Sequence, residues 1–158
     1  MRATHAAVFD VLDAKNVSLF GENMAAVHSI EYGALGSYFY LFGGLCDSGS
    51  GDETLQRWLS WDEVVAIGGM LGIPTVPCVW RGACFDPNVL RWKLDALARQ
   101  PSVFAEPEIP EAERVRPEGF VVRHATSFSS RDAHGSHSLK YEHRHHLQKN
   151  TKHKGCHV

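Results

Sequence analysis

A carboxylate and a guanidinium flank an apolar pattern in residues 117–123, which read Pro-Glu-Gly-Phe-Val-Val-Arg. The pattern predicts a turn that opens into a strand, with Glu118 at the entrance and Arg123 at the exit. Alternation along the strand puts Arg123 on the face opposite Phe120 and Val122. We expect Glu118 and Arg123 to lie near one rim of a sheet, where they hold an anionic ligand and its metal ion. A plain turn into a strand is the alternative that such a short pattern leaves open.

A second carboxylate, Glu22, follows a short strand that is predicted for residues 17–20 and ended by Gly21. Glycine leaves room for a ligand to approach the backbone closely, so Glu22 is a candidate binding residue. An exposed turn glutamate is the alternative interpretation.

The strongest predicted strand covers residues 37–43, in which four of five successive positions are aromatic. Aromatic residues fit the two-faced surface of a sheet. One face is expected to carry Tyr38, Tyr40 and Phe42, and the other Phe39 and Leu41. Core packing explains most of these rings, and stacking of one ring on a nucleobase is the alternative.

Two helices with clear end signals follow this strand. A capping box at residues 60–63 starts a helix that runs to about Leu71 and ends at Gly72 and Pro74. The residues expected to be buried on it are Val64, Val65, Ile67 and Leu71. A second helix starts at Asp86 and Pro87 and runs to about Arg99. The residues expected to face inward on it are Val89, Leu90, Leu94 and Leu97.

The other segments are weaker predictions. We expect an amphipathic helix over residues 4–14, an extended or edge strand over 75–82, a solvated connection over 101–117 and a polar loop over 127–138. Together these elements predict an α+β fold, with an antiparallel-rich sheet and two or three packed helices. The domain is expected to cover residues 1–148, followed by a basic tail rich in His and Lys at 149–158.

Length and composition are those of one ordinary globular domain. The chain has 158 residues, 44% of them hydrophobic and 22% charged, and a formal net charge of −2. No apolar run approaches the roughly 20 residues of a membrane span, and the N-terminus lacks the apolar core of a signal peptide. The four cysteines form no C-x-x-C pair, which argues against a disulfide framework or a zinc ribbon. A cytoplasmic location is therefore expected.

Eight of the ten histidines lie at or after His124, which makes the C-terminal region unusual. The candidate zinc or nickel ligands there are His134, His137, His143, His145, His146, His153, Cys156 and His157. Their spacing matches no closed four-ligand site, so a solvated tail with adventitious metal affinity is the leading interpretation. The neighbouring lysines also make the tail a candidate for binding an RNA backbone without catalysis.

Several stretches, taken in order, resemble the ATP-dependent RNA ligase family of covalent nucleotidyltransferases. They are Phe-Gly-Glu-Asn at 20–23 with Ala-Val-His-Ser-Ile at 26–30, then Ser-Tyr-Phe-Tyr-Leu-Phe at 37–42, then Glu-Gly-Phe-Val-Val-Arg at 118–123. Lys140 and Tyr141, continuing to residues 146–148, resemble the final lysine motif of the family. Residues 59–63 and 71–77 resemble the helix and strand that bacterial ligases place after the aromatic strand. The resemblance covers about residues 16–148.

The resemblance implies a reaction and a set of residue roles. In the family, a lysine amine attacks ATP, the adenylate passes to an RNA 5′-phosphate, and a 3′-hydroxyl then displaces AMP. Glu22 would hold the ribose hydroxyls, and Phe39 with Tyr40 would form the wall on which adenine stacks. Glu118 would help to place Mg²⁺, Lys140 would contact the phosphates, and Arg123 would complete the nucleotide site.

The nucleophile of that reaction is missing from the sequence. No Lys-x-Asp-Gly motif occurs, and Lys15, which precedes Glu22, lacks the following Asp-Gly. Lys93, in Lys-Leu-Asp-Ala, also departs from the motif and lies in a predicted helix. The final motif differs as well, since Glu142 and His143 stand where relatives carry valine and arginine.

We therefore expect a truncated or inactive portion of an RNA ligase that binds nucleotide and RNA, and its own enzymatic activity stays open. The expected partners are RNA ends, and not a membrane, with the lysine supplied by another chain or by a missing N-terminal segment. The alternatives are a non-catalytic RNA- or metal-binding module and a non-functional remnant.

Overall fold

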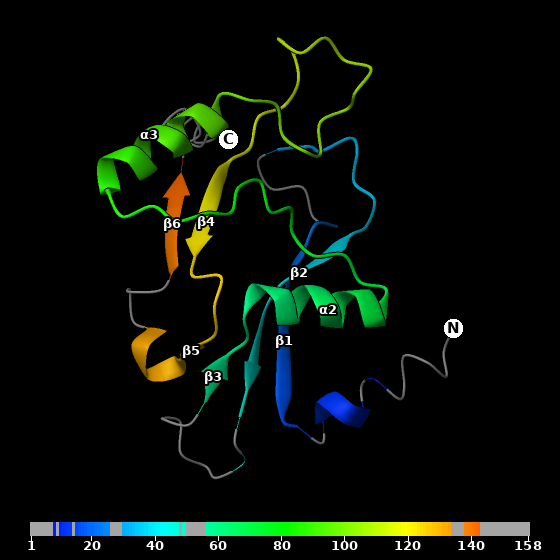
Figure 1. Cartoon of the computed structure of the whole chain (residues 1–158). Helices are drawn as coiled ribbons and strands as arrows, with labels where there is room; N and C mark the ends of the chain where they lie inside the picture. The colour runs from blue at the N-terminus through cyan, green and yellow to red at the C-terminus, as the bar shows by residue number, and fades with distance from the viewer. Residues whose placement is uncertain are drawn as a thin grey trace, which may run out of the picture. The chain divides into compact units, whose positions relative to one another are not determined.

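The computed structural model describes residues 8, 10–13, 15–25, 30–47, 49, 56–133 and 138–142 of the chain (Figure 1). It combines antiparallel strands with helices, so the predicted α+β fold is confirmed. The chain divides into two compact units, which are described one at a time. Unit 1 comprises Met1–His28, Leu35–Arg81 and Arg123–Leu139, and unit 2 comprises Ser29–Ala34, Gly82–Val122 and Lys140–Val158.

Unit 1 contains a four-stranded antiparallel sheet with the strand order β1-β2-β3-β5. The strands are β1 (Val17–Asn23), β2 (Phe39–Cys46), β3 (Arg57–Trp58) and β5 (Phe128–Ser129). In β1, Val17 and Leu19 pack against the hydrophobic core while Ser18 between them is exposed. This period of two is the pattern of a strand with one face on the core.

Helix α2 (Trp61–Leu71) begins and ends where the sequence predicted. The Ser60 hydroxyl accepts a hydrogen bond from the Glu63 N–H (3.3 Å), and the Glu63 carboxylate accepts one from the Ser60 N–H (2.7 Å). Arg57 donates to both carboxylate oxygens of Glu63, and this bond is the main reason why the pKa of Glu63 falls from 4.5 to about 2. Gly72 ends the helix in the left-handed conformation, with φ at 67°.

The hydrophobic core of unit 1 lies between α2 and the sheet, and Figure 1 shows α2 lying across β1 and β2. Its buried members are Leu12, Leu41, Leu59, Val64, Ile67 and Leu71. Val65 was also expected in the core, and this prediction is wrong because Val65 is 44% exposed. A helix advances by about 100° per residue, which turns Val65 away from the sheet that Val64 contacts.

A β-bulge in β2 decides which side chains share a face of this sheet. Phe20 pairs with Gly43 and the next residue, Gly21, pairs with Leu41, so Phe42 is the extra residue. The order in which side chains alternate between the two faces of β2 therefore reverses at Phe42. Leu19, Leu41 and Arg57 are turned toward α2, and the opposite side, here called the far face, carries Phe20, Glu22, Tyr40, Trp58 and Phe128.

Unit 2 contains α3 (Pro87–Ala98) and a two-stranded sheet of β4 (Gly119–Arg123) and β6 (Ser138–Glu142), which run in opposite directions in Figure 1. Arg123 and the first two residues of β6 belong to unit 1. Asp86 caps α3 by accepting a hydrogen bond from the Asn88 N–H (2.8 Å). The Tyr141 hydroxyl donates to the Asp95 carboxylate, which ties β6 to α3.

Several predicted boundaries need correction. β1 continues past Gly21 to Asn23, because the bulge on β2 keeps the two strands paired. Residues 75–82 form no regular strand, and only Thr75 makes a parallel bridge, to Leu41. The stretch 127–138 contains β5, the short helix η2 (Ser130–Ala133) and the start of β6. Val89 was expected to face inward on α3 and is 49% exposed.

Two predictions of secondary structure are confirmed within the described ranges. Residues 8 and 10–13 are helical, and residues 101–117 contain neither helix nor strand. Cys46, Cys78 and Cys84 are free thiols. No described helix is long and apolar enough to cross a membrane. The tail at 149–158 and the histidines from His134 onward lie outside the described residues.

Candidate functional site

Glu22 lies in β1 directly opposite Tyr40 of β2, so the two residues share the far face. The Glu22 side chain is exposed, whereas Tyr40 is only 6% exposed. The Tyr40 hydroxyl accepts hydrogen bonds from the N–H groups of Gly36 and Ser37, each at 3.1 Å. Tyr40 thus anchors the loop that leads into β2, and Glu22 presents a carboxylate beside this anchored end of the sheet.

Phe39 lies at the same end of the sheet but on the face opposite Glu22, since it pairs with Asn23. Its ring covers Gly21, where the ring atoms would clash with a Cβ atom. The ring is 41% exposed. A side chain at position 21 would therefore force the Phe39 ring to move.

Arg123 binds main-chain carbonyl groups. Its Nη1 donates to the Phe42 carbonyl and its Nη2 to the Leu59 carbonyl, both at 2.8 Å. The guanidinium also lies over the Trp61 ring, 5.9 Å from its centroid. Burial lowers the pKa of Arg123, although an arginine keeps its charge in proteins. Arg123 therefore joins the bulge of β2 to the residue before the α2 cap.

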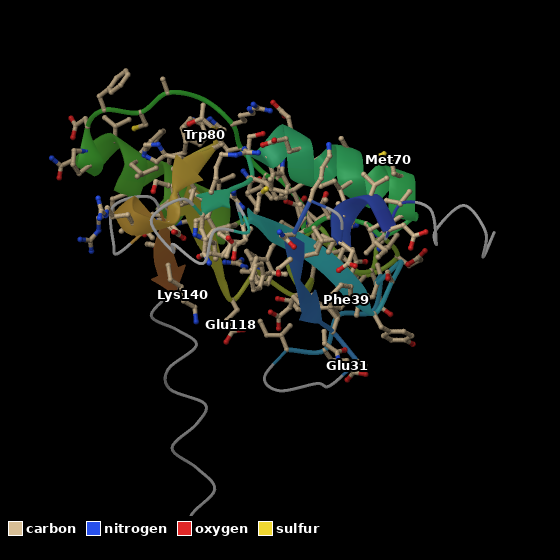
Figure 2. The ribbon with its side chains drawn as sticks, turned by 90° about the horizontal axis from the view of Figure 1, so that it is seen from below. Glu31, Phe39, Met70, Trp80, Glu118 and Lys140 are labelled. Carbon is tan, nitrogen blue, oxygen red and sulfur yellow. The ribbon has the colours of Figure 1, made fainter. Side chains whose placement is uncertain are left out.

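Glu118 and Lys140 belong to unit 2, and both side chains are exposed (Figure 2). Glu118 directly precedes β4, and Lys140 lies in the middle of β6. The Tyr32 hydroxyl lies close to Glu118. Burial raises the pKa of Tyr32, a hydrogen bond with the Glu118 backbone lowers it, and the Glu118 charge raises it. The Tyr32 ring packs edge-on against Phe104, with 5.8 Å between ring centroids.

The structure groups the predicted residues in two sets. Unit 1 holds Glu22, Phe39, Tyr40 and Arg123, and unit 2 holds Glu118 and Lys140. Within unit 1, only Glu22 and Tyr40 are direct cross-strand partners. Glu118 directly precedes β4 and Arg123 is its last residue, so the two lie at opposite ends of the strand, whereas the sequence predicted that they share one rim.

The carboxylates of the described part of the chain form no preassembled metal cage. No group of three or more His, Cys, Asp or Glu side chains there is arranged to hold an ion. Mg²⁺ commonly uses one or two protein carboxylates and completes its shell with water and substrate phosphates. The Glu118 carboxylate is exposed and has the chemistry of such a ligand.

Sequence reasoning missed three aromatic residues on the far face. Phe20, Trp58 and Phe128 lie in different strands, and their rings contact each other in sequence order across the sheet. Neither Trp58 nor Phe128 belongs to a long strand pattern, since β3 and β5 have two residues each. The sequence shows one aromatic residue in each of these short segments, but that these residues share a face follows only once the strand pairing is known.

The chain matches a protein-family model described as RNA ligase over residues 1–142. Searches of curated proteins and of solved structures gave no significant match. The family match includes all six candidate site residues and covers most of the 158 residues. On this evidence the chain belongs to the RNA ligase family.

Proposed function

We propose that this chain forms a nucleotide- and RNA-binding portion of an RNA ligase that joins RNA ends through ATP-dependent adenylyl transfer. The observation that carries the proposal is the family match over residues 1–142. RNA ends are the proposed partners, and the cytoplasm is the proposed location.

Each proposed role matches the chemistry of the side chain. Glu22 offers an exposed carboxylate that can accept hydrogen bonds from ribose hydroxyls. Tyr40 lies beside Glu22 on the same face for the adenine, whereas Phe39 lies at the same end of the sheet on the other face. Lys140 offers an exposed ammonium for phosphate oxygens. Arg123 contributes positive charge and holds the bulge that orients the sheet residues.

Glu118 is the proposed ligand of Mg²⁺. When bound, the ion neutralises charge that develops on the transferring phosphoryl group. Glu118 would hold the ion from one side, and its backbone hydrogen bond with Tyr32 would fix the turn that carries it.

The sequence contains no Lys-x-Asp-Gly motif, so we propose that these residues bind ATP without forming the lysine adduct. The nucleophilic lysine would come from a different segment or from another chain. A complete reaction would need that lysine beside the bound nucleotide.

Equilibrium dialysis of ATP and Mg²⁺ against the purified chain tests the proposed nucleotide site. Loss of one hydrogen bond to a charged group costs about 1.5–3 kcal/mol, so Glu22→Gln and Lys140→Met should each weaken ATP binding about tenfold or more. The exposed residues Glu111 and Lys15 supply matched controls, and Glu111→Gln and Lys15→Met should bind ATP like the wild type. Equal binding by all five proteins would contradict the assignment of Glu22 and Lys140.

A further inference from the structure

Three aromatic rings form a row on the far face of the unit 1 sheet. Phe20 and Trp58 have ring centroids 5.3 Å apart, and Trp58 and Phe128 have centroids 6.3 Å apart with ring planes inclined by 24°. Because these residues come from β1, β3 and β5, the row crosses the sheet from its first strand to its last. We call these three residues the aromatic row.

The aromatic row is separate from the hydrophobic core. Among the described residues, the core cluster and the partly buried residues packed against it do not include Phe20, Trp58 or Phe128. The three side chains are half-buried, so part of each remains accessible to solvent. Core packing against α2 therefore does not explain why three aromatic residues are aligned there.

Gly43 makes the row continuous. A Cβ atom built on Gly43 would lie 3.4 Å from Cζ3 of Trp58, so the indole extends across β2 at the position that lacks a side chain. The bulge at Phe42 turns Gly43 toward the far face. The Trp58 ring can consequently reach Phe20 on the other side of β2.

One cationic group, the Arg123 guanidinium, lies next to the row, and a second arginine, Arg131, follows Phe128 by three residues in the sequence. The same built Cβ atom is 3.8 Å from Nη1 of Arg123, which places the guanidinium beside Trp58. Arg131 is exposed in η2, directly after β5, which carries Phe128. Aromatic rings flanked by positive charge are the combination that binds single-stranded nucleic acids, through base stacking and phosphate attraction.

We propose that the aromatic row is a stacking platform for unpaired bases of a single-stranded RNA end. A single stacked base would need only one aromatic ring, whereas a row of rings from three strands can stack with consecutive bases. The inference rests on the proposed function, because membership of the RNA ligase family supplies RNA as the occupant. Glu22 lies on the same face two residues from Phe20, about 7 Å along the strand, so the platform adjoins the proposed nucleotide site.

Fluorescence anisotropy with a short fluorescein-labelled single-stranded RNA tests the platform. Stacking of one base contributes enough that Trp58→Leu and Phe128→Leu should each weaken RNA binding by about fivefold or more. Trp58→Phe keeps an aromatic ring and should restore most of the affinity. The matched controls Trp92→Leu and Phe85→Leu remove exposed rings of unit 2, 70% and 97% exposed, and should bind RNA like the wild type.

A second measurement needs no substitution. RNA containing 5-iodouridine, irradiated in complex with the wild-type chain, should crosslink to peptides that contain Trp58 or Phe128. Crosslinks confined to other peptides, or variants that bind like the wild type, would overturn the platform and leave the proposed function intact. Displacement of the RNA from Trp58 by ATP alone would assign the row to the nucleotide and overturn its assignment to RNA. Failure of the wild type to bind any RNA would overturn both proposals, while ATP binding in the dialysis experiment would still support the nucleotide site.

Discussion

Replacement of Arg123 separates a structural role from direct ligand binding. Its guanidinium donates to the Phe42 and Leu59 carbonyls at 2.8 Å, and Leu59 is only 4% exposed. Hydrogen bonds to charged groups contribute about 1.5–3 kcal/mol each, and Phe42 is exposed enough for water to replace part of its bond. We therefore expect Arg123→Met to lower the free energy of unfolding by about 3 kcal/mol.

Urea unfolding followed by circular dichroism measures this loss. Arg123→Lys should recover only part of it, because one ammonium lacks the forked geometry that reaches two carbonyls. Arg91→Met removes an exposed arginine of α3 and should change stability by less than about 0.5 kcal/mol. Unfolding of Arg123→Met at the same urea concentration as the wild type, with a loss only of affinity for ATP, would contradict a structural role for Arg123.

Four further substitutions test charge, packing and hydrogen bonding. The hydrogen bond from Arg57 is the main cause that lowers the pKa of Glu63 to about 2. The ionised Glu63 therefore contributes its full stabilisation of the fold above pH 4.5, and this contribution is lost as the pH falls toward 2. Because the carboxylate is 41% exposed, the loss should be only about 1 kcal/mol, and urea unfolding of Glu63→Gln should lack this acid dependence. Gly44→Ala would bring a Cβ atom within 2.6 Å of a buried leucine methyl and should lower the free energy of unfolding by about 2 kcal/mol. A Cβ atom at Gly69 meets nothing within 4 Å, so Gly69→Ala should raise the free energy of unfolding by about 0.5–1 kcal/mol, measured by thermal unfolding. Tyr141→Phe removes the hydrogen bond to Asp95 and should destabilise unit 2 by about 1–2 kcal/mol, seen as faster amide exchange in β6.

Local sequence signals predicted the helices well because their determinants are local. The capping box at Ser60 and the glycine at position 72 define α2, and the Asp86-Pro87 pair starts α3. The strands were less predictable. The extension of β1 beyond Gly21 and the two-residue strands β3 and β5 depend on pairing between distant segments, which periodicity in one segment does not encode.

The candidate site shows the same difference between local and long-range information. The sequence motifs pointed to Glu22 and Phe39. Alternation of side chains within one strand cannot show whether two residues in different strands share a face of the sheet. Only the register shows that they lie on opposite faces. The carbonyl contacts of Arg123 span 81 and 64 residues of sequence, so no local pattern could reveal that its guanidinium binds two main-chain carbonyl groups.

Incubation of the chain with α-labelled ATP and Mg²⁺ tests most directly whether it binds nucleotide without reacting. Filter binding under native conditions reports nucleotide held at the site, and a denaturing gel reports a lysine adduct. We expect label on the filter, a loss of that label in Glu22→Gln, and no label on the gel. Label on the gel, lost in Lys15→Met or Lys93→Met, would contradict binding without reaction, and an absence of label in both assays would contradict the nucleotide site itself.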